Sequence, residues 1–156
     1  YGDAVVRFAA LHNWPADTEF KLVSVVAPLT SQPGISLEAK KVFFEEEKTH
    51  VDKLLSQEKT AFLKERPDAY VTYEVLVGHT AKEILDCAQN WPASMIIMGS
   101  HGRQGLERAF LGSVSFYVAS HAPCSVSIVR VAQCDMLDFD LDESDIPDEM
   151  KTGVEV

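Results

Sequence analysis

The chain has 156 residues, of which 46% are hydrophobic and 24% are charged, a composition suited to one folded domain with a real core. It contains no run of about 18 apolar residues and no basic-then-apolar opening segment, so we expect neither a membrane span nor a secretion signal. Its three cysteines, Cys87, Cys124 and Cys134, lack the close spacing of a metal site. We therefore expect reduced thiols in a cytoplasmic protein.

The formal net charge of −10 is unevenly distributed along the chain. Residues 131–156 contain nine acidic side chains and one lysine, a net charge of −8 that leaves −2 for residues 1–130. Nucleic-acid binding depends on clusters of Lys and Arg that contact phosphates, so we expect no nucleic-acid partner. We expect one domain at residues 1–131, followed by an acidic, disordered tail at residues 132–156.

The first half of the chain predicts two helices and one strand. Apolar side chains recur at helical spacing in residues 4–12, and a β-branched run at residues 20–26 is typical of a strand. Residues 38–66 are expected to form a long helix with one apolar stripe, composed of Phe44, Val51, Leu55 and Phe62. A heptad dimerisation helix is an alternative, but so short a stripe favours a helix that packs on a sheet.

The second half alternates strands and helices. Strands are predicted at residues 70–77, 94–98 and 125–131, with helices beginning at Thr80 and Ser113. Thr80 and Glu83 have the spacing of a capping box. The alternation along the whole chain predicts an α/β fold with a parallel sheet and helices on both faces. The wholly apolar strand at residues 94–98 is typical of the buried middle of such a sheet.

A glycine-rich loop follows this apolar strand and leads into the helix at Ser113. Gly99, Gly102 and Gly112 allow the backbone to approach a ligand closely, and the helix N-terminus adds partial positive charge. Backbone N–H groups and hydroxyls could thus converge on a phosphate, with Arg103 contributing a charge-assisted hydrogen bond. In the alternative interpretation, the glycines only turn the chain and Ser113 only caps a helix. Neither strict nucleotide-binding glycine motif is present.

The spacing Gly99-x2-Gly102-x9-Gly112-Ser113 closely resembles the ATP-binding motif of the universal stress protein family. Two further segments are similar to that family, one at the start of the last strand and one after the strand at residues 70–77. They are Ala122-Pro123-Cys124-Ser125-Val126 and Val77-Gly78-His79-Thr80. The resemblance extends from residue 1 to about residue 131.

This resemblance implies an open, doubly wound, Rossmann-like parallel sheet of the adenine nucleotide alpha hydrolase type, with strand order 3-2-1-4-5. It implies a site for ATP or AMP, with or without Mg²⁺, at the carboxyl ends of the strands, and a homodimer formed through the last strand, from Ser125 to Val131. Val25 and Met98 would line the adenine pocket. The ribose and phosphates would contact the following residues of the motif: Gly99, Ser100, His101, Gly102, Arg103, Gly112, Ser113, Val114 and Ser115.

The sequence departs from the family at its beginning. Universal stress proteins open with a strand and an aspartate-containing turn that contacts the nucleotide, whereas this sequence opens at its first predicted helix. That strand would be central in the sheet, and without it the backbone groups of its neighbours would be unsatisfied. We expect upstream residues in the natural protein, or a partner chain or residues 153–156 in this position. We also expect the chain as given to bind ATP poorly.

No catalytic or metal-binding motif is recognisable, and His101 between two glycines suits a ligand contact better than acid–base catalysis. We therefore expect an ATP-binding regulatory protein, a homodimeric stress or signalling module that acts on an unknown protein partner. Any ATP hydrolysis should be slow. The alternatives are an interaction module that binds no nucleotide, and an enzyme of related fold that cleaves or transfers adenylate.

Overall fold

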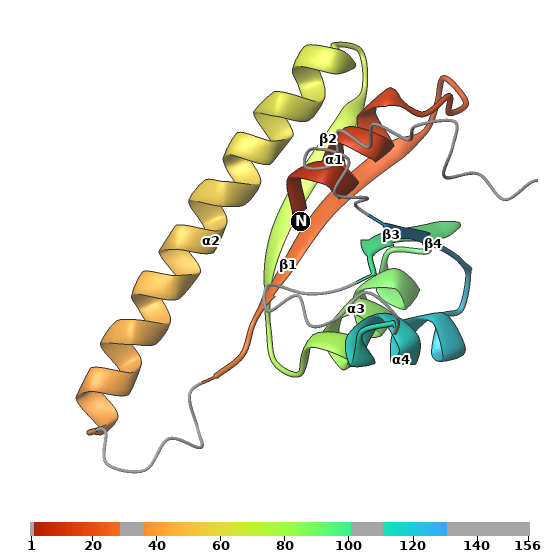
Figure 1. Ribbon diagram of the computed structural model, residues 1–156. Helices are drawn as coiled ribbons and strands as arrows, with labels where there is room; N and C mark the ends of the chain where they lie inside the picture. Colours follow the sequence, from red (N-terminus) through yellow and green to blue (C-terminus); the bar gives the residue numbers. More distant parts are fainter. Residues whose placement is uncertain (1, 29–35, 101–110, 131–156) are drawn as a thin grey trace, which may run out of the picture.

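Helices and strands alternate along the whole described chain, as the sequence predicts. The computed structural model describes residues 2–28, 36–100 and 111–130 (Figure 1). The elements in chain order are α1 (Gly2–Leu11), β1 (Glu19–Val26), α2 (Leu37–Glu65), β2 (Tyr70–Val77), α3 (Thr80–Asn90), β3 (Met95–Gly99), α4 (Ser113–His121) and β4 (Ser125–Val129). The predicted boundaries lie within two residues of these. The predicted acidic tail lies outside the described residues.

The strands form two parallel pairs. In the first pair, β1 lies beside β2, from Glu19 opposite Tyr70 to Val26 opposite Val77. In the second pair, β3 lies beside β4 in parallel register. Within the described residues these pairs are separate two-stranded sheets, and neither β1 nor β3 has a second hydrogen-bonded neighbour. The parallel arrangement is therefore confirmed, whereas a single continuous sheet is not observed.

The helices connect the two strand pairs. On one side α1 packs beside α2 and also contacts β3 and β4, while α3 contacts β1, β2 and α4 (Figure 1). An apolar cluster beneath α1 holds both pairs together. Its buried members are Ala9, Ala10, Phe62 and Val71, and Phe20 and Leu22 of β1 and Ile97 of β3 pack against them. The core thus spans the two sheets although their backbones are not paired.

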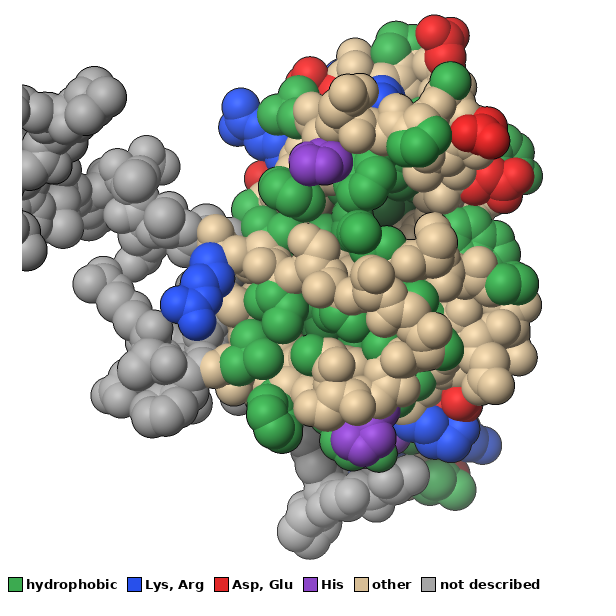
Figure 2. All heavy atoms as spheres, turned by 90° about the vertical axis from the view of Figure 1, so that its right-hand side faces the viewer, with side chains coloured by type: hydrophobic (Ala, Val, Ile, Leu, Met, Phe, Trp, Pro, Cys, Tyr) green, Lys and Arg blue, Asp and Glu red, His purple; other side chains and the backbone are tan. Residues whose placement is uncertain are grey.

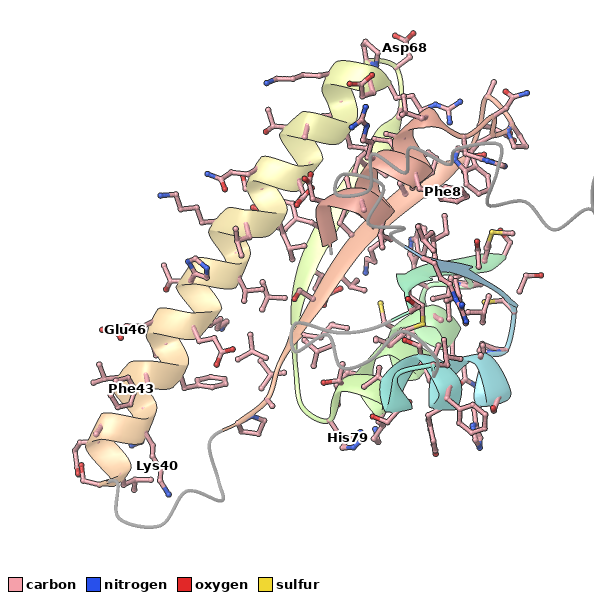
Figure 3. The ribbon with its side chains drawn as sticks, viewed as in Figure 1. Phe8, Lys40, Phe43, Glu46, Asp68 and His79 are labelled. Atoms are coloured by element: carbon pink, nitrogen blue, oxygen red, sulfur yellow. The ribbon has the colours of Figure 1, made fainter. Side chains whose placement is uncertain are left out.

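The long helix α2 packs on the β1–β2 pair through its predicted stripe. Val51, Leu55 and Phe62 are buried, and Phe44 is half-buried against the cluster of Val26, Val51 and Leu55. The interpretation of α2 as a helix packed on a sheet is therefore confirmed. None of residues 37–50 is buried, and Phe43 on this half of the helix is 51% exposed (Figure 3).

The predicted capping box at the start of α3 is wrong. The N-cap residue is His79, and no side chain caps this helix. The side chain of Glu83 instead lies against Gly78, where a Cβ would collide with the Glu83 carboxylate. Gly78 has a φ of 150°, which side-chain-bearing residues rarely adopt. The glycine therefore allows a close contact that moves Glu83 away from the capping position.

The stripe of α2 predicts a stability difference between two phenylalanines of the same helix. Phe62→Ala should lower the free energy of unfolding by about 3–5 kcal/mol, because it leaves a cavity in the cluster beneath α1. Phe43→Ala, at the exposed position, should change it by about 0.5 kcal/mol or less. Urea unfolding of both variants measures the difference, and equal losses would contradict this packing.

Candidate functional site

The carboxyl ends of β1 and β2 lie side by side, because the two strands are parallel and in register. Val26 ends β1 and is completely buried, and its carbonyl accepts a hydrogen bond of 3.1 Å from the Gly78 N–H. His79 follows in the turn from β2 to α3 (Figure 3). In parallel α/β sheets, ligands bind at such carboxyl ends.

The second strand pair ends in a tightly hydrogen-bonded turn that joins the two halves of the glycine motif. The Ser100 N–H donates to the Val129 carbonyl at 3.1 Å, and the Gly112 N–H donates to the Ser100 carbonyl at 2.9 Å. The Ser115 hydroxyl donates to the Gly99 carbonyl at 2.8 Å. Residues 99–100 and 112–115 are therefore neighbours in space although ten residues separate them in the sequence.

The N-terminus of α4 lies at this turn. Gly112 is the N-cap residue, and no side chain caps the helix, so the alternative that Ser113 only caps it is not observed. The first backbone N–H groups of any helix lack a carbonyl acceptor within the helix. The first turn of α4 contains no acidic residue that would repel an anion. These features together suit a negatively charged group.

Ser115 has a structural role that the sequence did not indicate. The residue is 3% exposed, and its hydroxyl proton is used in the hydrogen bond to Gly99. The side chain therefore ties α4 to the end of β3. Any contact of Ser115 with a phosphate would use its backbone N–H.

The remaining predicted site residues divide into three groups. Val25 and Met98 are half-buried near the carboxyl ends of β1 and β3, the facing strands of the two pairs. In the first turn of α4, Ser113 is exposed and Val114 is half-buried. His101, Gly102 and Arg103 lie outside the described residues.

No described group has the surroundings of a catalytic nucleophile or a metal ligand set. Cys87 is near the ion pair in which Lys21 Nζ donates to Glu74 Oε2 at 2.7 Å. Burial raises the pKa of the Cys87 thiol, although Lys21 opposes this shift, so the thiol is protonated at neutral pH. Among the described residues no three His, Cys, Asp or Glu side chains could share a metal ion, and no helix is long and apolar enough to cross a membrane.

A cavity of about 670 Å³ lies at the opposite, amino ends of β1 and β3. Figure 2 faces this end, where hydrophobic side chains line a recess. Trp14 and Trp91, with Phe20, Met95 and Ile97, provide much of its apolar lining. The sequence analysis did not identify this site. Its signal is the repeated Trp-Pro pair, which follows α1 at Trp14 and follows α3 at Trp91.

Comparison with known proteins places the chain among universal stress proteins. The model of the universal stress protein family matches residues 1–130. A segment of 58 residues is 47% identical to a universal stress protein of Synechocystis and covers 37% of this chain and 38% of that protein. A segment of 57 residues is 44% identical to a universal stress protein of Methanocaldococcus jannaschii, covering 36% of this chain and 34% of that protein.

The fold is also that of a solved universal stress protein. UspA from Lactobacillus plantarum superimposes with a TM-score of 0.67 at 22% identity, over 80% of this chain and 83% of that chain. The chain matches less than two fifths of the length of the two curated relatives. The family model, in contrast, spans the helices and strands of the described fold. The chain therefore belongs to the universal stress protein family.

Proposed function

We propose that this chain is an ATP-binding regulatory protein that acts as a homodimeric, nucleotide-dependent stress or signalling module in the cytoplasm. The observation that carries the proposal is the hydrogen bond from the Gly112 N–H to the Ser100 carbonyl, which brings the two halves of the glycine motif together. Family membership and the uncapped N-terminus of α4 support a phosphate ligand at this turn.

In this proposal the motif divides the nucleotide among its residues. Val25 and Met98 contact adenine, and the N-terminus of α4 faces the phosphates together with Arg103. Ribose and the phosphates contact Gly99, Ser100, His101, Gly102, Gly112, Ser113, Val114 and Ser115. ATP or AMP would bind with or without Mg²⁺. No catalytic residue is assigned, and ATP hydrolysis would at most be slow.

The strand order 3-2-1-4-5 is part of this proposal. The two pairs lie in the orders β2–β1 and β3–β4, and a strand between β1 and β3 would complete a five-stranded sheet. The homodimer would form through β4, whose outer edge has no strand neighbour among the described residues.

One observation favours the second candidate, a protein-interaction module without nucleotide. Val25 and Met98, which would both contact adenine, belong to two separate sheets in this structure. Native mass spectrometry of the purified chain with and without Mg-ATP distinguishes the candidates. A dimer that carries ATP or AMP supports the first candidate. A dimer that stays free of nucleotide at saturating ATP supports the second.

The glycine motif predicts the effect of one methyl group. Gly112→Ala should abolish ATP binding, because the added Cβ would obstruct the approach of phosphate to the backbone. Gly112 has φ −59° and ψ 149°, which alanine adopts readily, so the fold and its melting temperature should be retained. Calorimetric titration with ATP measures the loss. Ser120→Ala, in the last turn of α4, is the matched control, and unchanged binding by Gly112→Ala would refute this site.

The acidic tail should contribute little to nucleotide binding. Deletion of residues 135–156 removes nine acidic side chains and one lysine and should leave the ATP affinity nearly unchanged, because like charges only repel the nucleotide. Titration of both chains at low and high salt tests this, since salt screens such repulsion. A large loss of affinity on deletion would mean that the tail forms part of the site.

A further inference from the structure

The facing edges of β1 and β3 are the structural feature from which we argue. Each strand has a hydrogen-bonded neighbour on one side only, β2 for β1 and β4 for β3. A strand edge without a neighbour presents a row of backbone N–H and C=O groups that can pair with another strand. Val26 is completely buried at the end of β1, so this edge reaches into the interior of the molecule.

The helices limit the space between these edges. Phe20 and Leu22 of β1 and Ile97 of β3 pack on the same apolar cluster beneath α1. On the other face, α3 contacts β1 and also packs beside α4, which contacts β4 (Figure 1). Because both layers bridge the two pairs, an inserted segment would be covered on both faces. Strands in such positions are apolar on both sides and rich in β-branched residues.

The cavity at the amino ends of β1 and β3 marks where such a segment would begin. Its lining combines the rings of Trp14 and Trp91 with the carboxylates of Asp17 and Glu19, and contains no Lys or Arg. A basic residue ahead of an apolar run would therefore be complementary in charge to this end of the position. The two tryptophans are the only ones in the chain.

We propose that the position between β1 and β3 accepts a fifth, parallel strand from a separate polypeptide segment. This segment has a basic residue followed by five or more consecutive Val or Ile residues, since β3 has five residues and β1 has eight. It would pair with both edges through backbone hydrogen bonds and join the two sheets. This inference does not depend on nucleotide binding.

The fluorescence of Trp14 and Trp91 tests the proposal directly. The probe is the acetylated and amidated peptide Lys-Lys-Val-Ile-Val-Val-Ile, added to the full 156-residue chain. We expect a saturable shift of tryptophan emission to shorter wavelength, because the peptide would exclude water from the cavity. A peptide of the same sequence with alternate backbone nitrogens methylated keeps the side chains but loses hydrogen bonds, and should cause no saturable shift. Equal shifts with both peptides, or no shift with either, would overturn the proposal.

Variants locate the peptide and identify competing occupants. Ile97→Lys, within the cavity, should abolish the shift, whereas Phe116→Lys, at a position 63% exposed on α4, should preserve it. Preserved uptake by Ile97→Lys would overturn the assigned position. If the shift appears only after deletion of residues 131–156, the chain's own tail fills the position, and a separate segment as the occupant is refuted.

A last measurement separates this proposal from the proposed function. The carboxyl end of the added strand would lie between Val26 and Gly99, beside the glycine motif, so the peptide should increase the ATP affinity at least several-fold if the chain binds ATP there. Peptide uptake without any ATP binding would refute the nucleotide site and leave the strand position intact. ATP binding without peptide uptake would have the opposite meaning.

Discussion

The apolar cluster beneath α1 is the interaction on which the arrangement of this molecule depends. Within the described residues, no backbone hydrogen bonds join β1 to β3, so the two strand pairs are held together by helix packing. Phe62 of α2, with Ala9 and Ala10 of α1, contacts side chains from β1 and from β3. Apolar contacts of this kind are not directional, whereas strand hydrogen bonds specify register. The relative position of the two sheets is therefore determined by packing alone.

This constraint affects the two ends of the strands differently. At the carboxyl end, backbone hydrogen bonds from Ser100 and Gly112 and the Ser115 hydroxyl fix the turn before α4. At the amino end, Trp14 and Trp91 surround a cavity between the pairs. The rigid end has the features of an anion site, and the open end has those of a strand-binding position. A nucleotide that contacts both Val25 and Met98 would need the two pairs to be correctly spaced.

Much of the secondary structure could be predicted because its signals are local. The strand at residues 70–77 and the helix at residues 113–121 follow from β-branched runs, prolines and glycines nearby in the sequence, and the structure places them at these bounds. The stripe of α2 identified its buried face correctly. The capping box failed because Glu83 packs against Gly78, a contact that spacing does not reveal. The Trp-lined cavity was missed because its two Trp-Pro pairs are 77 positions apart in the sequence.

The sequence by itself determined the alternation of helices and strands, the glycine spacing and the resemblance to universal stress proteins. These properties depend on residues that are close together in the chain, where propensity and periodicity act. Only the tertiary structure decided that Gly112 contacts Ser100, that the Ser115 hydroxyl is used internally, and that the strands form two pairs. Such features depend on which distant backbone groups find partners in three dimensions, and no local pattern specifies them.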